Sequence, residues 1–596
     1  MDHRALLAQS RLFAGIAPAA LDQLAERTTV CGFRSGQAVF AIGAAADCIY
    51  IVATGRLRVE NADGSLRGEV GLLECVGEVA ILAGHPRSAE VYAVRDSYLL
   101  RIARDDLLEF LQAHPAVLLR LTQVVIGRLQ MAATPSSRAG ASRPRCIALL
   151  GASPHIDLNA IAQRMHATLA ECGDVRIVDG RSVDAALGKG ISQMSPGMAA
   201  EDILVRHLHQ AEGAHRHLIY LCDRVPSSWT DRCLRQCDRV MVVADARTPP
   251  SLTPMLEELR DLKLRVPVEL ILQCPEDCRA DSVLPWRELS GARTHYLLRP
   301  DHPRDAEALA RSISGRALGL VLGGGGARGF AHIGLLRALE ESRLPLDVLG
   351  GTSMGAFVSA LAACGYDWKQ VLQITRETFV ERHLLNDYLL PRVALIRGRK
   401  FYKRLQTIFG ERRIEELRTP FFCVSTNLTR GKAVVHDRGP LALWVATSMA
   451  IPGVAPPVVW HGDLLVDGGV VNSLPTDVMQ NLERGPIIAS DVSTEGALTL
   501  PGVEGPDVDA VLRWAPLRPH EGRRPSLISI LFRTATMTSE SGVAARAARA
   551  DAYLRLPVSG VALFDWKKLD EVAQRGYEFA MQQLPALEAR LRACPV

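Results

Sequence analysis

Two glycine-rich segments, each directly after a short apolar run, restrict the fold of the C-terminal half of this chain more than any other feature. The apolar run at 318–322 leads into glycines at 323–326, and a helical pattern follows. A second apolar run at 346–349 leads into the sequence G-x-S-x-G at 351–355, again before a helical pattern. Strand, tight loop and helix repeated in this order predict an α/β domain.

The second segment has the sequence of a nucleophile elbow. In such an elbow a serine occupies a strained turn between a strand and a helix, and its neighbours two positions away must be small. We therefore predict that Ser353 is an exposed catalytic nucleophile, with Gly351 and Gly355 as its small neighbours.

The first segment can hold an anion, because contiguous glycines let backbone N–H groups point at a ligand without intervening side chains. Gly324, Gly326 and Gly329 also match G-x-G-x-x-G, and Asp347 lies near the distance expected for a ribose-binding acid. The elbow that follows decides against a dinucleotide site and favours an oxyanion hole for ester hydrolysis.

A serine nucleophile needs a base. His332 is close in sequence, but it lies on the helix after the glycine loop and is expected to be a packing residue. Asp467 is the better candidate, because it ends an apolar strand and precedes Gly468 and Gly469, which permit close approach to Ser353.

These three elements in this order resemble the patatin-like phospholipases, which use a Ser–Asp dyad. The resemblance covers roughly 318–481 and includes the segment 446–452 upstream of the aspartate. It implies that Ser353 is the nucleophile and Asp467 the general base. It also implies that Gly324, Gly325 and Gly326 donate to the oxyanion, and that Arg328 shapes their loop.

Residues 77–91 resemble the phosphate-binding cassette of cyclic-nucleotide-binding domains, and they lie in a strand-rich region at 33–101. The resemblance implies that Glu78 accepts a ribose hydroxyl and Arg87 neutralises the cyclic phosphate, with Gly77 and Ser88 lining the pocket. We favour ligand binding here. The alternative is a domain that keeps the fold as an interaction module.

The middle of the chain reads as α/β, and its segment 229–238 resembles the central region of the neuropathy target esterase family. Residues 564–570 and 576–577 resemble the tail of that family. Gly151 follows an apolar strand, but no G-x-x-x-x-G-K-[ST] accompanies it, so no phosphate loop is expected.

We therefore predict a multidomain chain with five regions. They are a β-barrel (jelly-roll) cyclic-nucleotide-binding-type domain with trailing helices at 1–131, a linker at 132–145, an α/β middle region at 146–316, an α/β patatin-like hydrolase domain at 317–481, and a C-terminal extension at 482–596 that packs on the hydrolase domain.

Composition restricts cofactors and compartment. The 13 cysteines are scattered and odd in number, and the start of the chain is polar, so we expect reduced thiols in a cytoplasm. The pairs Cys233/Cys237 and Cys274/Cys278 lack the usual zinc spacing, so we expect no metal. The net charge of +4 does not favour nucleic acid. A cyclic nucleotide is expected only as a regulatory ligand.

We expect a serine hydrolase that cleaves acyl esters of lysophospholipids or phospholipids. A non-enzymatic cyclic-nucleotide-responsive scaffold and an esterase for soluble esters remain as alternatives. Basic residues crowd at 392–404, so reversible peripheral contact with the inner face of the membrane is a further expectation. No transmembrane helix is expected, because glycines interrupt the apolar stretch 348–366 and prolines interrupt 440–460.

Overall fold

The chain forms two compact units, Met1–Ala310 and Arg311–Val596, which are described separately. The computed structural model describes residues 3–133, 146–195, 201–262, 264–276, 279–300, 302–382, 386–390, 392–493, 509 and 527–593. Most of the predicted linker, residues 134–145, lies outside these residues, as does Cys278.

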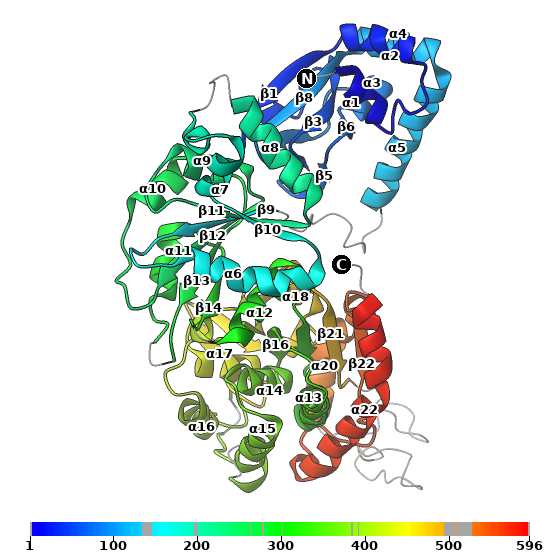
Figure 1. The fold of residues 1–596 in the computed structure, drawn as a ribbon. Coiled ribbons are helices and arrows are strands. Elements are labelled where there is room, and N and C mark those ends of the chain that lie inside the picture. Colours follow the sequence, from blue (N-terminus) through cyan, green and yellow to red (C-terminus); the bar gives the residue numbers. More distant parts are fainter. Residues whose placement is uncertain are drawn as a thin grey trace. The chain divides into compact units, whose positions relative to one another are not determined.

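The N-terminal part of the first unit is a sandwich of two antiparallel four-stranded sheets (Figure 1). The sheets have the orders β1-β8-β3-β6 and β2-β7-β4-β5, and a hairpin whose turn contains Asp63 and Gly64 joins β4 to β5. The strands are β1 Thr29–Phe33, β2 Ala38–Phe40, β3 Cys48–Thr54, β4 Leu57–Glu60, β5 Leu66–Val70, β6 Cys75–Val76, β7 Glu90–Ala93 and β8 Ser97–Ala103. The helices are α1 His3–Gln9, α2 Pro18–Glu26, α3 Glu78–Ala83, α4 Arg104–Ala113 and α5 Pro115–Ala133.

Strand β3 shows why this sandwich forms. Its side chains alternate between two cores, as the two-residue period of a strand requires. Ile49 and Ile51 pack with the helices, whereas Tyr50 and Val52 pack between the two sheets. The jelly-roll-type domain predicted for this region is therefore confirmed as a β-sandwich with helices at one side.

The middle of the chain is a parallel six-stranded sheet in the order β10-β11-β9-β12-β13-β14, with helices on both faces (Figure 1). The strands are β9 Cys146–Gly151, β10 Val175–Val178, β11 His217–Leu221, β12 Arg239–Asp245, β13 Val268–Gln273 and β14 Thr294–Leu298. The helices are α6 Leu158–Leu169, α7 Gly180–Leu187, α8 Glu201–Ala214, α9 Ser228–Gln236, α10 Pro254–Asp261, α11 Val283–Ser290 and α12 Pro303–Ile313.

Buried ion pairs join the sandwich to this sheet within the first unit. Arg232 and Arg235 of α9 both contact the Asp96 carboxylate, at 3.2 and 3.1 Å. Arg95 pairs with Glu212 of α8. The segment at 229–238 thus forms part of an internal contact, and the carboxylates compensate the buried guanidinium groups.

The second unit is built on an eight-stranded sheet in the order β19-β20-β17-β16-β15-β21-β22, with β18 paired to β17. Strands β17, β16, β15, β21 and β22 are parallel, and β18 and β20 run antiparallel to β17. The strands are β15 Gly319–Leu322, β16 Val348–Thr352, β17 Phe421–Asn427, β18 Lys432–His436, β19 Val458–Trp460, β20 Asp463–Asp467, β21 Ile487–Asp491 and β22 Ala552–Arg555.

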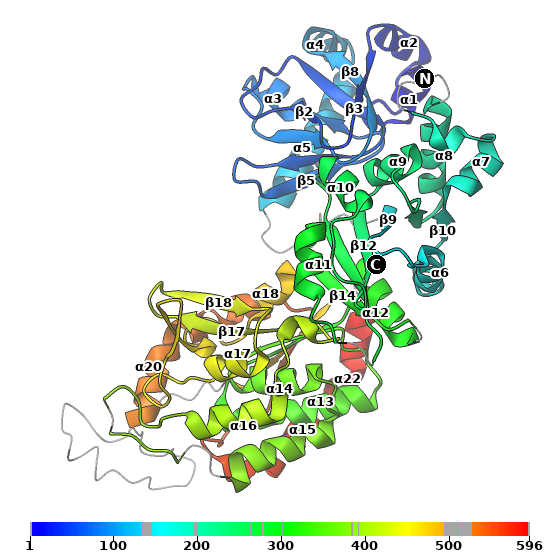
Figure 2. The same cartoon turned by 90° about the vertical axis from the view of Figure 1, so that its left-hand side faces the viewer.

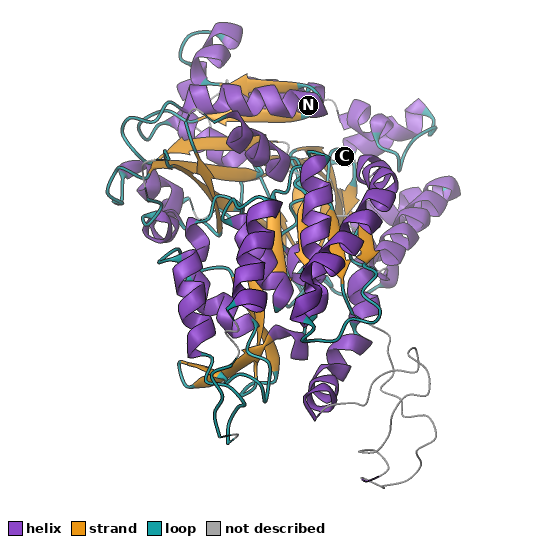
Figure 3. Cartoon of the chain, turned by 90° about the horizontal axis from the view of Figure 1, so that it is seen from below, coloured by secondary structure: helices purple, strands orange, loops and turns teal. Residues whose placement is uncertain are grey.

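Both faces of this sheet are covered, so its central strands are apolar at consecutive positions. Leu320 and Leu322 face the larger core with α13, α14 and α22, and Val321 faces a smaller core near α18. Figure 2 shows these two sides, and Figure 3 shows the helices of the larger one in front of the strands. The helices are α13 Ala331–Glu341, α14 Met354–Ala363, α15 Trp368–Thr375, α16 Arg399–Phe409, α17 Leu441–Ser448, α18 Thr476–Asn481, α20 Leu527–Ser541, α21 Val543–Ala547 and α22 Leu569–Ala593.

The segment 482–596 differs from the predicted extension. Its strands β21 and β22 are hydrogen-bonded members of the same sheet, and β21 lies directly beside β15. Parallel neighbours are joined through long crossovers, so their pairing leaves no local signal in the sequence. Residues 494–508 and 510–526 of this segment lie outside the described residues.

The two apolar stretches at 348–366 and 440–460 form strands and helices of this unit instead of membrane spans. Across the residues that the structure describes, no helix combines the length and the apolar character needed to cross a bilayer.

Candidate active site

Ser353 lies on a sharp turn between β16 and α14, as the G-x-S-x-G sequence predicts. Its φ and ψ are 56° and −123°, a conformation that costs a non-glycine residue about 1–3 kcal/mol. Gly351 and Gly355 flank the turn, and a Cβ atom on Gly355 would lie 2.1 Å from the Leu322 carbonyl oxygen. The turn can therefore pack against β15 only with glycine at 355.

The expected exposure of the serine is wrong, because Ser353 is only 6% exposed. Its hydroxyl faces a carboxylate, and the glycine loop passes over its side chain. A Cβ atom on Gly324 would lie 3.3 Å from the Ser353 Cβ. The nucleophile candidate is thus covered by the loop predicted to hold the oxyanion.

Asp467 is the partner of Ser353. The Ser353 hydroxyl donates to Asp467 Oδ2 at 2.7 Å, and the Gly469 amide donates to Oδ1 at 2.8 Å. Asp467 ends β20, and Gly468 packs against the Val424 carbonyl of β17. Burial raises the pKa of Asp467 to about 6, and the bonds from Ser353 and Gly469 oppose that rise.

The glycine loop places its amide groups unequally. The Gly324 N–H donates to the Ser473 carbonyl at 2.9 Å, and that of Gly323 donates to Ser490. Within the described part of the chain, no hydrogen bond is seen from the amides of Gly325 and Gly326. The Gly324 amide, a predicted oxyanion donor, therefore already has an acceptor in Ser473, whereas the amides of Gly325 and Gly326 have none among the described residues.

The end of the loop is anchored far along the chain. The Ala327 amide donates to the Leu563 carbonyl at 2.8 Å, and Arg328 Nε donates to the Val561 carbonyl at 3.0 Å. Gly329 lies in the 3-10 turn Gly326–Phe330 and contacts the Met354 side chain. Arg328 is thus tied to the tail of the chain, and its role in shaping the loop stays a prediction.

The two other polar residues weighed in the sequence, His332 and Asp347, do not contact Ser353. His332 is fully buried on α13, with Nε2 2.9 Å from the Gly323 carbonyl oxygen and Nδ1 3.0 Å from Ser490 Oγ. Burial lowers its pKa to about 4, so it is neutral near pH 7. Asp347 pairs with Arg311 at 2.8 Å and accepts from the Leu318 amide, which leaves no role for it at a ribose.

Sequence reasoning missed two serines that hold the site. Ser448 Oγ accepts from the Ser353 amide at 2.9 Å and donates to the Val424 carbonyl at 2.7 Å. The Ser473 carbonyl accepts from the Gly324 amide, and the Ser473 amide donates to Ser539 Oγ of α20 at 2.8 Å. Ser448 lies in the segment 446–452 noted above, whereas no sequence pattern indicates Ser473.

The residues predicted to bind a cyclic nucleotide are brought together in the sandwich, but protein groups occupy them. Arg87 is buried, donates to the carbonyls of Gly77 and Cys48, and stacks on the Phe40 ring. Glu78 is 1% exposed and accepts from Arg128 of α5 at 2.5 Å. Ser88 is exposed and accepts from Arg67.

In the described part of the middle region, no phosphate loop is formed after Gly151. Helix α6 begins after Asp157, whose carboxylate accepts from the Ala160 amide where a phosphate would otherwise bind. Cys233 and Cys237 are buried free thiols, and burial raises the pKa of both. No group of three or more metal-ligating side chains occurs in the described ranges.

Comparison with known proteins identifies the parts of the chain. Residues 320–479 match the patatin-like phospholipase family, and residues 31–114 match the cyclic nucleotide-binding domain. Residues 144–288 match the P-loop like domain of the neuropathy target esterase family. The class is therefore a patatin-like protein with a cyclic nucleotide-binding domain before its catalytic sheet.

The relatives place the chain more narrowly. An uncharacterized NTE family protein of Mycobacterium tuberculosis is 30% identical over 98% of this chain and 97% of its own length. This chain belongs to the neuropathy target esterase (NTE) family. Patatin-like phospholipase domain-containing protein 6 of Pongo abelii and protein 7 of Mus musculus are each 30% identical over 91% of this chain. The chain spans 44% of the length of each of these two proteins.

Proposed function

We propose that this protein is a serine hydrolase that cleaves the acyl ester of a lysophospholipid or phospholipid. The observation that carries the proposal is the 2.7 Å hydrogen bond from the buried Ser353 hydroxyl to Asp467 on a strained elbow. Membership of the NTE family and the match to patatin-like phospholipases support a lipid ester as the substrate.

The site residues divide the reaction into two steps. Asp467 takes the Ser353 proton as Oγ attacks the ester carbonyl, and the amides of Gly325 and Gly326 donate to the resulting oxyanion. Collapse breaks the ester bond, the alcohol leaves with the proton from Asp467, and the acyl group stays on Ser353. Asp467 then deprotonates a water molecule that attacks the acyl-enzyme. The bond between the acyl group and Ser353 breaks, Oγ takes the proton from Asp467, and the fatty acid leaves.

A fluorophosphonate probe tests the proposal, since it reacts only with an activated serine. We expect one adduct, on the peptide that contains Ser353, and hydrolysis of micellar lysophospholipids in preference to monomeric soluble esters. Absence of an adduct and of hydrolysis would favour the non-enzymatic scaffold. Equal turnover of micellar and monomeric esters would favour an esterase for soluble substrates.

Contact with a lipid surface forms the second part of the proposal. An apolar loop at 386–390 and 392–396 carries Tyr388, Leu390 and Val393, which are 74%, 71% and 65% exposed. The Leu395 amide donates to the Gly453 carbonyl, and Leu531 of α20 lies 3.8 Å from a Cβ atom built on Gly453. The apolar loop is therefore attached to the chain between α17 and β19, close behind Ser448.

Exposed basic residues lie beside the apolar loop, at Arg392, Arg397, Arg399, Lys400 and Lys403. Arg404, which belongs to the same basic stretch, instead pairs with Glu377 at 2.8 Å. Insertion of the apolar side chains and attraction of the basic ones to anionic lipid act together, at about 1 kcal/mol per basic residue.

The apolar loop gives a direct prediction for membrane binding. We expect the double change Leu390→Ser and Val393→Ser to weaken sedimentation with anionic vesicles about tenfold or more, because full burial of each side chain contributes about 1.5–3 kcal/mol. Val225→Ser removes an apolar side chain that is 64% exposed in the other unit, and should leave binding unchanged. Equal loss in both variants would contradict the loop as the docking surface.

Cyclic-nucleotide binding is the third part of the proposal, and it requires that Arg128 leave Glu78. We expect a ribose hydroxyl and the Arg128 guanidinium to compete at the Glu78 carboxylate, so nucleotide binding displaces the Arg128 side chain at the end of α5. Binding and the position of α5 are then linked, and the linkage is the route to regulation.

The competition predicts opposite effects from two substitutions. We expect Arg128→Ala to strengthen binding of a cyclic nucleotide, and Arg87→Leu to weaken it about tenfold or more through loss of a charged hydrogen bond. Arg120→Ala changes the same helix at a residue that contacts the Ala14 carbonyl, and should have no effect. Calorimetry with cyclic AMP, cyclic GMP and cyclic dinucleotides measures this. No binding to any variant would make the domain an interaction module.

A further inference from the structure

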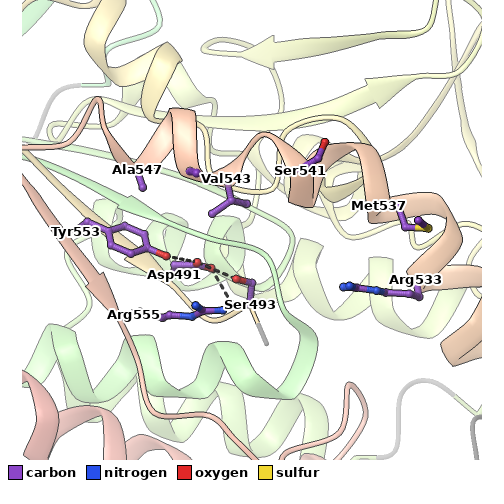
Figure 4. Close-up of a pocket in the computed structure, with 10 residues that line it drawn as sticks. Asp491, Ser493, Arg533, Met537, Ser541, Val543, Ala547, Tyr553 and Arg555 are labelled. Atoms are coloured by element: carbon purple, nitrogen blue, oxygen red, sulfur yellow. Dashed lines mark hydrogen bonds between the residues drawn. The ribbon is translucent and has the colours of Figure 1, made fainter. Parts of the chain in front are cut away.

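A cavity of about 750 Å³ lies in the second unit, at the carboxyl ends of β21 and β22. Its polar lining consists of Asp491, Ser493, Arg533, Ser541, Tyr553 and Arg555, and the apolar lining residues come from α20 and α21 (Figure 4). Parallel α/β sheets bind ligands at the carboxyl ends of their strands, and the volume is in the range of small-molecule sites.

The cavity adjoins the glycine loop through two connections. Val492, between two lining residues, packs so closely that a Cβ atom on Gly325 would lie 2.6 Å from its Cγ2. Helix α20 is tied to the same loop, because Ser539 Oγ accepts from Ser473, whose carbonyl accepts from Gly324. The cavity wall and the glycine loop are therefore in contact through Val492 and through Ser539 of α20.

The charge of the cavity favours an anion. Arg533 and Arg555 extend toward the cavity from α20 and from the end of β22 (Figure 4). Burial lowers the pKa of Arg328, and the positive charge of Arg533 lowers it further. A negative group near Arg533 would reduce the repulsion between these two guanidinium groups, one of which shapes the glycine loop.

Asp491, the acidic residue of the cavity lining, accepts hydrogen bonds from neighbouring protein groups. The Asp491 carboxylate accepts from the Tyr553 hydroxyl at 2.6 Å and from the amide and hydroxyl of Ser493, both at 2.8 Å. These three bonds fix Asp491 at the wall of the cavity. Its carboxylate and the Tyr553 ring form a surface for the cationic end of a zwitterionic molecule.

We propose that this cavity is the head-group subsite of the lipid substrate, where Arg533 and Arg555 donate to the oxygens of its phosphate. This inference rests on the proposed hydrolase function. In a lysophospholipid the three glycerol carbons separate the ester from the phosphate, so the two groups must occupy adjacent sites. The glycine loop contacts Ser353 at Gly324 and Val492 of the cavity wall at Gly325, and guanidinium groups match phosphate oxygens bidentately.

Paired substrates test the subsite. We expect Arg533→Gln and Arg555→Gln each to lower kcat/KM for lysophosphatidylcholine about tenfold or more, and to change kcat/KM for a monoacylglycerol with the same acyl chain less than about twofold. Arg549→Gln is the matched control, because Arg549 contacts Gln480 and does not line the cavity. It should leave the kcat/KM of both substrates unchanged.

Soluble competitors test the unmodified protein and separate a lipid head group from a free anion. Glycerophosphocholine should inhibit monoacylglycerol hydrolysis, whereas the same concentration of inorganic phosphate should not. Equal inhibition by inorganic phosphate would overturn the head-group assignment in favour of a free anion site. An equal decrease of kcat/KM for both substrates in the arginine variants would also overturn the assignment. If the wild-type protein hydrolyses neither substrate and Ser353 takes no fluorophosphonate, the proposed hydrolase function fails instead.

Discussion

Replacement of Ser353 by alanine is expected to abolish ester hydrolysis and to leave the fold intact. The change removes the only atom that forms the acyl-enzyme in the proposed mechanism, and it removes one hydrogen bond to Asp467. Turnover of a lysophospholipid by the purified variant is the measurement, with thermal unfolding as the test of the fold. Residual turnover above about one thousandth of wild type would show that Ser353 is not the nucleophile.

A second substitution at this position separates catalysis from strain. Ser353→Gly should be equally inactive, but it relieves a φ of 56° that alanine keeps. Relief of the strain stabilises the glycine variant by about 1–3 kcal/mol. The greater freedom of glycine in the unfolded chain destabilises the same variant by about 0.4–1 kcal/mol. The glycine variant should therefore unfold at a temperature equal to or higher than the alanine variant, as differential scanning calorimetry would show.

The second large effect is expected at Asp467. Asp467→Asn should lower turnover at least about 10²-fold, because an amide cannot take the Ser353 proton. In the wild-type protein turnover should rise with pH through about 6, since only the ionised carboxylate acts as a base and burial raises its pKa to about that value. His332→Gln should lower turnover far less. A dominant effect at His332 would overturn the dyad.

The same pKa predicts how stability depends on pH. The folded state holds the Asp467 proton more tightly than the unfolded state, whose carboxyl pKa is about 3.9. Wild-type protein thus loses stability relative to Asp467→Asn as pH rises from below 4 through 6. From low to high pH, the difference in unfolding free energy between the two proteins changes by about 3 kcal/mol. Urea unfolding of both proteins at pH 4 and pH 8 measures it, and a pH-independent difference would contradict the raised pKa.

The local structure of this site could be predicted from the sequence. The apolar runs before the two glycine segments form β15 and β16, and the elbow and the 2.7 Å contact of Ser353 with Asp467 occur where G-x-S-x-G and D-G-G predict them. The strands and the elbow depend on residues within about ten positions, so their geometry follows from short-range sterics and hydrogen bonding. The contact of Ser353 with Asp467 joins residues 114 positions apart, and its prediction rested on the resemblance to the patatin-like phospholipases. The catalytic roles of Ser353 and Asp467 remain predictions.

The long-range part could not be predicted. The pairing of β21 with β15, the anchoring of Arg328 by Val561, and the contact of Arg128 with Glu78 join residues 50 to more than 200 positions apart. No periodicity or motif marks such partners. The burial of Ser353 was missed for the same reason, because the glycine loop that covers it is placed by contacts outside the elbow.

The anchoring of the glycine loop has a consequence for the synthesis of the protein. A ribosome makes the elbow and Asp467 well before it makes Val561 and Leu563, whose carbonyls fix the loop at Ala327 and Arg328. Strand β22 and helix α22, which complete the sheet and cover α13, come late as well. A nascent chain thus carries Ser353 and Asp467 before the glycine loop is fixed. If the proposed function holds, ester hydrolysis is expected only after most of the chain has left the ribosome.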